Sequence, residues 1–274
     1  PVYGFIYYKN KKKLRNASPQ AIKEVFRFSN MLSRLFIYGE ITLVAVVVIV
    51  PVVYIFGMAF ANIRTDIPNQ IWPDQPSFDA FVYLFKETNF KVWYLNTLSI
   101  ALINMFVGTF LITGAAYVFA RFSFKGKKAG LLTILVLQAF PSFMGLIAMY
   151  VLFWKFGLLG QPRMLSILYI GGSIPGNLWL IKGFLSQIPK NLDESAMIDG
   201  ASKFQIFIKI IIPLSLPILT FVAVSMFMGP WMDYLLPGYL LRFKPAGAAA
   251  DYDITQQWTL AIGLFRFIND QTYR

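Results

Sequence analysis

The best cluster of acidic side chains in the sequence consists of Asp193, Glu194 and Asp199. Clustered carboxylates near a membrane interface can hold a divalent metal ion, which is the chemistry that a membrane-embedded glycosyltransferase would need. The sequence contains neither histidine nor cysteine. Catalysis by histidine, metal ligation by histidine or thiolate, and disulfide formation are therefore excluded.

The sequence also lacks the motif that most ATP-hydrolysing proteins use to bind the phosphates of ATP. No phosphate-binding loop of the form G-x-x-x-x-G-K-[ST] occurs, and the basic turn at residues 124–128 lacks its glycine spacing. We therefore predict that this chain does not hydrolyse ATP and carries no cofactor or metal ion of its own.

The carboxylates lie in a polar segment whose local signals predict two short helices joined at a glycine. Asn191 followed by Glu194 fits the start of the first helix, and Gly200 fits its end. Ser202 followed by Gln205 has the capping-box spacing and predicts the start of the second helix. The second helix leads directly into an apolar stretch.

The first of these helices is expected to form a contact surface. Ser195 and Ala196 are small enough to let another protein approach closely, and Glu194 and Asp199 can form hydrogen bonds or ion pairs. The alternative is an ordinary helical connection between membrane spans. We favour the contact surface because long ordered loops between spans are usually functional.

The composition is that of a polytopic membrane protein. Hydrophobic residues make up 57% of the 274 residues, charged residues 14%, and the mean hydropathy is +0.58. The net charge of +12 would suggest nucleic acid in a soluble domain. Here the basic residues flank apolar stretches, where anionic lipid and membrane topology explain them. We expect lipid contact and no nucleic-acid partner.

Five uncharged runs are long enough to cross a bilayer of about 30 Å. They occupy residues 41–63, 92–120, 129–154, 164–181 and 210–232. The fourth run contains Gly171, Gly172, Pro175 and Gly176, which is typical either of a kinked or broken helix that lines a cavity or of close packing at small residues.

The distribution of Lys and Arg predicts the orientation. Segments 1–40, 121–128 and 182–209 together carry 16 of the 25 basic residues. The positive-inside rule therefore places these segments, and with them the polar hairpin, in the cytoplasm.

These runs divide the chain into three predicted regions. Residues 1–40 form a cytoplasmic segment with an amphipathic helix that begins at Ser18 and Pro19 and lies on the membrane or binds a partner. Residues 41–232 form a core of five spans that includes the cytoplasmic loop 182–209. Residues 233–274 form an extracellular loop, after which we expect a sixth span.

None of the five runs contains an ionisable residue, which disfavours a carrier driven by protons or sodium. A substrate path would have to use neutral polar and aromatic groups. The candidates are Asn104, Thr113, Gln138, Asn177 and Trp231. Each could instead form hydrogen bonds between helices.

The polar hairpin resembles the "EAA" signature of the inner-membrane permease subunits of binding-protein-dependent ABC importers. In that signature Glu-Ala-Ala is followed by Asp-Gly-Ala, an isoleucine and Leu-Pro. Serine replaces the first alanine here, and Ile212 replaces the leucine. The matching residues are Glu194, Ser195, Ala196, Asp199, Gly200, Ala201, Ile210, Ile212 and Pro213.

The short motifs WLIKG at 179–183 and NTLS at 96–99 resemble motifs in the smaller membrane subunit of maltose and oligosaccharide importers. The resemblance covers residues 72–274. It implies an all-α polytopic helical bundle, the type I importer transmembrane domain, in the bacterial plasma (inner) membrane. It also implies that residues 194–201 couple the chain to an ATPase.

The resemblance further implies the partners. They are a homologous second permease subunit, two ATPase subunits that bind ATP and Mg²⁺, an extracellular sugar-binding protein, and an oligosaccharide of the maltodextrin or galactoside type. In the maltose system the larger membrane subunit holds most sugar contacts. The outer residues Asn269, Asp270, Gln271 and Thr272 align with a loop that reaches into the binding protein, although proline stands at the position of Asp270 in the family.

Two alternatives remain from the residues alone. One is a channel or secondary carrier for a neutral solute, against which the uncharged spans and the polar hairpin argue. The other is the membrane-embedded enzyme, which would use Asp193, Glu194 and Asp199.

Overall fold

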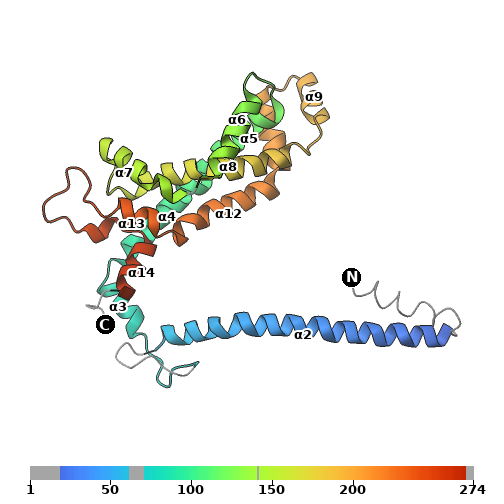
Figure 1. The fold of residues 1–274 in the computed structure, drawn as a ribbon, viewed down its shortest axis with the longest axis horizontal. Coiled ribbons are helices and arrows are strands. Elements are labelled where there is room, and N and C mark those ends of the chain that lie inside the picture. Colours follow the sequence, from blue (N-terminus) through green and yellow to red (C-terminus); the bar gives the residue numbers. More distant parts are fainter. Residues whose placement is uncertain (1–18, 62–70, 141, 270–274) are drawn as a thin grey trace. The chain divides into compact units, whose positions relative to one another are not determined.

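The computed structural model describes residues 19–61, 71–140 and 142–269, and every regular element in these ranges is a helix (Figure 1). The prediction of an all-α chain is confirmed. The chain divides into two compact units, of which the first ends at Lys86 and the second begins at Glu87.

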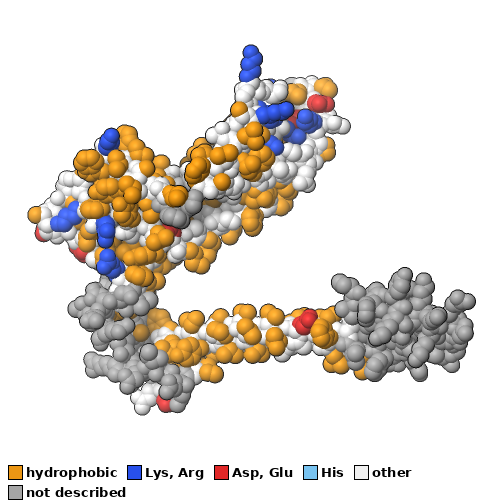
Figure 2. Space-filling view, in the orientation of Figure 1, with side chains coloured by type: hydrophobic (Ala, Val, Ile, Leu, Met, Phe, Trp, Pro, Cys, Tyr) orange, Lys and Arg blue, Asp and Glu red, His pale blue; other side chains and the backbone are white. Residues whose placement is uncertain are grey.

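The first unit is built on α2 (Pro19–Ala59), a single helix of 41 residues. The helix continues without a break through residue 40, where an amphipathic segment and a span are predicted to meet, and this boundary stays a prediction. Hydrophobic side chains cover the visible face of α2 (Figure 2), and Leu35, Leu43 and Ile55 are all more than 60% exposed. Such a surface is stable only where lipid or protein covers it.

An aromatic cluster closes the first unit after α2. The ring of Phe60 lies 5.4 Å from Phe78, 5.4 Å from Phe81 and 6.1 Å from Trp72. The short helix α3 (Asp79–Lys86) follows Phe78. Through these rings, the described residues from Trp72 to Phe81 pack against the residue that follows α2.

The second unit is organised around a continuous helical rod. It consists of α4 (Phe90–Ile103), the π-helical turn η1 (Asn104–Gly108) and α5 (Thr109–Arg121), 32 residues in all. The rod agrees with the uncharged run at 92–120. The rod packs against α8 (Leu165–Leu185) and α12 (Leu216–Met232).

The uncharged run 129–154 does not form one helix. It forms α6 (Lys127–Gln138), a 3-10 turn η2 (Ser142–Gly145) and the short helix α7 (Leu146–Lys155). That this interrupted run crosses the membrane stays a prediction. The sequence has a proline at position 141, and proline lacks the amide hydrogen that an unbroken helix would need.

The run 164–181, for which a kinked or broken helix and close packing at small residues are the two alternatives, is not interrupted. Despite Pro175, α8 is one helix of 21 residues, preceded by the 3-10 turn η3 (Pro162–Met164). Added Cβ atoms at Gly171 and Gly172 would meet no other atom within 4 Å, so these glycines do not mark close packing. A Cβ atom at Gly176 would lie 3.2 Å from Gln138 Nε2, so the close contact with a neighbouring helix is at this glycine.

The final apolar run is bent. The helical segment Lys203–Leu214 and α12 meet at an angle of 82° around Ser215. Pro213 and Pro217 flank this residue, and each removes one helical hydrogen bond. In the part of the chain that the structure describes, three helices are long and apolar enough to cross a membrane, or four if the bent pair is counted as one span. Five crossings stay a prediction.

The second unit has two hydrophobic clusters. One joins α5, α8 and α12 to the polar hairpin, with Ile112, Ile181, Ile206 and Val222 at most 1% exposed. The other lies at the opposite end of the rod and joins α4 and α8 to α13 (Leu235–Leu240) and α14 (Leu260–Asn269).

Candidate functional site

The polar hairpin consists of α9 (Asn191–Ile198) and α10 (Lys203–Ile206), followed by the π-helical turn η4 (Phe207–Ile211) and the short helix α11 (Ile212–Leu214). In Figure 1 it lies at the end of the second unit where α5 and α6 meet. Gly200 ends the first helix with φ +83°, as predicted. The amide of Ala201 donates to Ala196 O at 2.9 Å and that of Gly200 to Met197 O at 3.1 Å. This is a complete Schellman motif.

The start of the second helix is also as predicted. Ser202 Oγ accepts the amide of Gln205, and Gln205 Oε1 accepts the amide of Ser202. The predicted cap at Asn191 is wrong. Asn191 is already the first helical residue, and the preceding Lys190 is itself in the helical region of backbone conformation.

The hairpin presents a mixed surface. Glu194, Ser195 and Asp199 are exposed, as expected. Ala196 is only 9% exposed and packs in the core with Ala201, so its expected place on the surface is wrong. Apolar side chains take that place instead. They are Leu192, Met197, Ile198 and Phe204, of which Ile198 is 86% and Phe204 68% exposed.

A buried ion pair fixes the hairpin to the rod. Arg121 Nε lies 2.9 Å from Asp193 Oδ2, and the two side chains are 5% and 13% exposed. Arg121 Nη1 also donates to the carbonyl of Ile188 at 3.0 Å. Asp193 is therefore committed to a cation. In the described ranges no group of three acidic side chains lies close enough to hold a metal ion.

Aromatic contacts reinforce this attachment. The ring of Tyr117 lies 4.9 Å from Phe207 and 5.6 Å from Phe122, and the ammonium group of Lys203 lies 4.7 Å from the Phe122 ring. The sequence does not show these partners because they lie more than 60 residues away from the hairpin. One feature of the sequence could have indicated Arg121 as a partner of the hairpin: it is the first charged residue after a long uncharged run.

The neutral candidates for a substrate path separate into different environments. Thr113 Oγ1 donates to Thr109 O at 2.6 Å within its own helix, so its polar group is already satisfied. Asn104 is 1% exposed in η1, and its Oδ1 has no partner. Gln138 is exposed, and its Nε2 would lie 3.2 Å from a Cβ at Gly176, next to the half-buried Asn177.

Trp231 belongs to a separate aromatic group. Its ring lies 5.3 Å from that of Tyr94 and 5.8 Å from that of Phe227, and its indole N–H is buried without a partner. A buried N–H that lacks an acceptor costs free energy.

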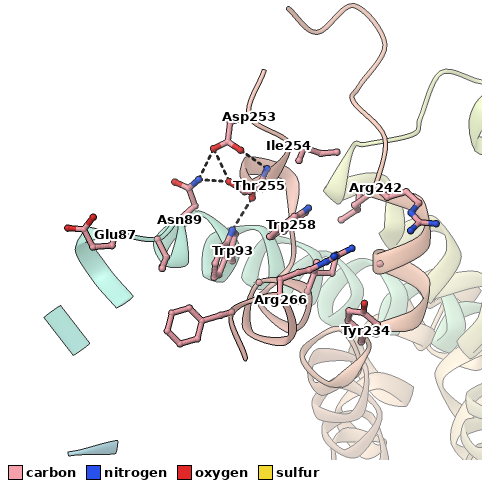
Figure 3. A pocket seen from close by; sticks show the side chains of 16 residues that line it. Glu87, Asn89, Trp93, Tyr234, Arg242, Asp253, Ile254, Thr255, Trp258 and Arg266 are labelled. Carbon is pink, nitrogen blue, oxygen red and sulfur yellow. Dashed lines mark hydrogen bonds between the residues drawn. The ribbon is translucent and has the colours of Figure 1, made fainter. Parts of the chain in front are cut away.

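At the opposite end of the rod from the hairpin lies a pocket of about 670 Å³ (Figure 3). Its wall combines the aromatic rings of Trp93, Trp258 and Tyr234 with the charged groups of Arg242 and Arg266. The N-terminal end of α4, the loop through Asp253 and α14 contribute to it. The predicted loop residues Asp270, Gln271 and Thr272 follow α14 but lie outside the described residues, and Asn269 is the last residue of α14.

The sequence of this chain matches one known protein family. The family described as "Binding-protein-dependent transport system inner membrane component" matches residues 108–268. The chain belongs to this family. It is a membrane permease subunit, as the signature at 194–201 predicts, and the matched residues include the hairpin, the ion pair and most of α14.

Several relatives align with most of the chain. It is 39% identical over 239 residues to the galactooligosaccharides transport system permease protein GanQ of Bacillus subtilis, with 86% of this chain and 81% of the relative aligned. It is 41% identical over 194 residues to the maltodextrin transport system permease protein MalD of Streptococcus pneumoniae, covering 71% and 65%. It is 36% identical to the maltodextrin permease protein MdxG of B. subtilis, covering 88% and 83%.

The fold has a counterpart among solved structures. A chain of a bacterial ABC transporter for import of the acidic polysaccharide alginate superimposes with a TM-score of 0.74, covering 89% of this chain and 82% of that one. Its sequence is 22% identical. The predicted importer-type helical bundle is confirmed by this likeness.

Proposed function

We propose that this permease is one of two homologous membrane subunits of an ATP-driven importer for oligosaccharides of the maltodextrin or galactoside type. The relatives that it resembles over most of its length carry maltodextrin or galactooligosaccharide in their names. The observation that supports the ATP-driven mechanism is the hairpin, a mixed apolar and acidic surface attached to the rod by a buried ion pair.

The hairpin is the proposed docking surface for the ATPase. Ile198 and Phe204 provide apolar area, and Glu194 and Asp199 provide charge, which together are typical of a protein interface. Each of two ATPase subunits would bind Mg²⁺ and ATP and meet one permease subunit at such a hairpin. Closure of the ATPase pair would move the hairpin and rock the two permease bundles between outward-open and inward-open states.

On this account the hairpin faces the cytoplasm of a bacterial cell, as the basic residues predict, and α14 faces outward. An extracellular binding protein would deliver the sugar. Asn269, Asp270, Gln271 and Thr272 would reach into it and help to release the sugar. The uncharged groups near Trp231, Gln138 and Asn177 are the proposed contacts along the path, because sugars bind through neutral hydrogen bonds and aromatic faces.

The docking role is tested by charge reversal. Wild-type chain and Glu194→Lys are co-purified with the ATPase subunit from membranes that express the whole assembly. Asp251→Lys is the matched control, since it reverses an exposed carboxylate at the other end of the second unit. We expect Glu194→Lys to lose the ATPase and Asp251→Lys to retain it. Equal recovery with both variants would remove the hairpin from the interface.

The outer loop is tested by deletion of residues 269–272. We expect sugar uptake to fall while the permease subunits and ATPase still co-purify. Wild-type uptake by the deletion variant would rule out a role for this loop. A self-contained channel or carrier, the alternative function, would transport without ATP.

A further inference from the structure

The rod Phe90–Arg121 is held at both ends by segments that are distant in sequence. We infer that the rod is the mechanical link between α14 and the polar hairpin. Trp93 at one end and Arg121 at the other are its positioning residues. This inference rests on the proposed function, because it assigns a route between the two partner-binding ends.

The first grip is a set of hydrogen bonds from α4 to the backbone that enters α14. Thr97 Oγ1 accepts the amide of Leu260 at 2.8 Å, so a side chain of one helix caps the start of another. Asn96 Nδ2 donates to the carbonyls of Gln256 at 2.8 Å and Trp258 at 3.0 Å. Trp93 Nε1 donates to the carbonyl of Thr255 at 2.9 Å. Three side chains from the first two turns of α4 thus hold the start of α14 and the segment that leads into it.

Close packing fixes the same interface. Trp93 is 4% exposed, and a Cβ atom at Gly263 would lie 2.1 Å from its ring. No side chain other than hydrogen fits there without displacing α14 or the indole. Gly263 therefore lets α14 lie directly against Trp93, and the contact transmits displacement in either direction.

A polar rim extends this grip to the edge of the pocket. Figure 3 shows Asn89 facing Asp253 and Thr255, and Asn89 Nδ2 donates to Asp253 Oδ2 at 2.9 Å and to Thr255 Oγ1 at 2.6 Å. The turn before α14 is therefore tied to the residue that directly precedes α4. A partner that displaces this turn would pull on the end of the rod.

The second grip is the ion pair of Arg121 with Asp193 at the other end. The rod is helical at every residue from Phe90 to Arg121, which gives it a length of about 48 Å at 1.5 Å per residue. At its middle, a Cβ at Gly108 would lie 2.3 Å from Met226 Cε, so α12 packs tightly against η1. Movement of the rod would therefore also move α12, which bears Trp231.

The inference is tested in the complete assembly with the full-length chain, by ATP hydrolysis with and without sugar-loaded binding protein. Gly263→Ala inserts a methyl group against Trp93. Gly114→Ala is the matched control, because it adds the same methyl group within a helix of the second unit, in the rod itself, with no other atom within 4 Å. We expect Gly263→Ala to keep basal hydrolysis but to lose at least about fivefold of the stimulation, the lower range of allosteric coupling. Gly114→Ala should be stimulated like wild type.

A double variant distinguishes a single route from parallel ones. Arg121→Met should reduce the stimulation of ATP hydrolysis as Gly263→Ala does. The double variant should lose no more stimulation than the more strongly affected single variant, because both substitutions interrupt the same route. Wild-type stimulation of Gly263→Ala, or multiplied losses in the double variant, would overturn the inference. Should Gly263→Ala not reach the membrane, Asn96→Ala removes two hydrogen bonds without adding an atom and has the same two outcomes.

These results are separable from those for the proposed function. A wild-type chain that binds no ATPase, or whose assembly shows no stimulation, contradicts the importer itself. A stimulated wild type with an equally stimulated Gly263→Ala contradicts only the role of the rod.

Discussion

Removal of one partner of the Arg121–Asp193 pair should loosen the hairpin much more than removal of both. The pair is 2.9 Å apart, with side chains 5% and 13% exposed. A single substitution, Arg121→Met or Asp193→Asn, leaves a buried group without its partner and should cost about 3–5 kcal/mol. Arg121→Met combined with Asp193→Leu leaves no orphaned charge. It should cost only about 1–2 kcal/mol, chiefly from the lost hydrogen bond to the carbonyl of Ile188.

Limited trypsin digestion of the purified chain measures this difference where it arises. Lys190 and Lys203 are exposed cleavage sites that flank α9, and their rate of cleavage follows the population of the opened hairpin. A cost of 3 kcal/mol corresponds to an increase of about two orders of magnitude for each single variant. The double variant should be cleaved about tenfold faster than wild type. Single variants cleaved at the wild-type rate, or a double variant whose loss equals the sum of the single losses, would refute the reasoning.

Three further predictions follow from the hairpin and from the grip on α14. Gly200 has φ +83° and open space around its Cβ position. Gly200→Val should therefore lower the free energy of unfolding by about 1–2 kcal/mol through backbone strain alone, and Gly200→Asn should lower it by clearly less. Equal losses in the two variants would point to a steric clash. Ile198 is 86% exposed, so Ile198→Ser should leave the melting temperature of the isolated chain unchanged but weaken ATPase binding about tenfold or more in a titration, and unchanged binding would place Ile198 outside the interface. Burial raises the pKa of Asp253, but hydrogen bonds from the amide and hydroxyl of Thr255 and from Asn89 outweigh it and lower the pKa overall. The stabilisation from Asp253 should therefore be complete above the ordinary Asp pKa of about 3.9 and be lost as the pH falls through the lower pKa of the folded state. In an acid titration of stability, Asp253→Asn should lose less stability than wild type.

The sequence predicts the parts of the hairpin that depend on neighbouring residues. The Gly200 turn and the Ser202 and Gln205 box are local devices whose atoms lie within five residues of one another. The burial of Ala196 could not be predicted in this way, because it depends on a hydrophobic cluster to which distant parts of the chain contribute. The same limit hid Arg121, whose partner is 72 positions away along the chain.

The differences between the predicted spans and the observed helices also have a physical origin. An uncharged run shows that residues can enter a membrane, but it does not show whether they form one helix. Pro175 is accommodated within α8, whereas the run from 129 to 154 is interrupted. Neighbouring helices can satisfy the backbone groups that a proline frees, so tertiary packing decides which proline ends a helix. The grip of α4 on α14 joins residues more than 160 positions apart and left no local signal.

ATP-dependent sugar uptake by the reconstituted assembly tests the central claim most directly. The complete set of permease subunits, ATPase subunits and binding protein is placed in vesicles, and uptake of labelled maltodextrin is followed with ATP, without ATP, and with the Glu194→Lys chain. We predict uptake only with ATP, binding protein and an intact Glu194. Uptake that persists without ATP, or that is unchanged by Glu194→Lys, would contradict the account.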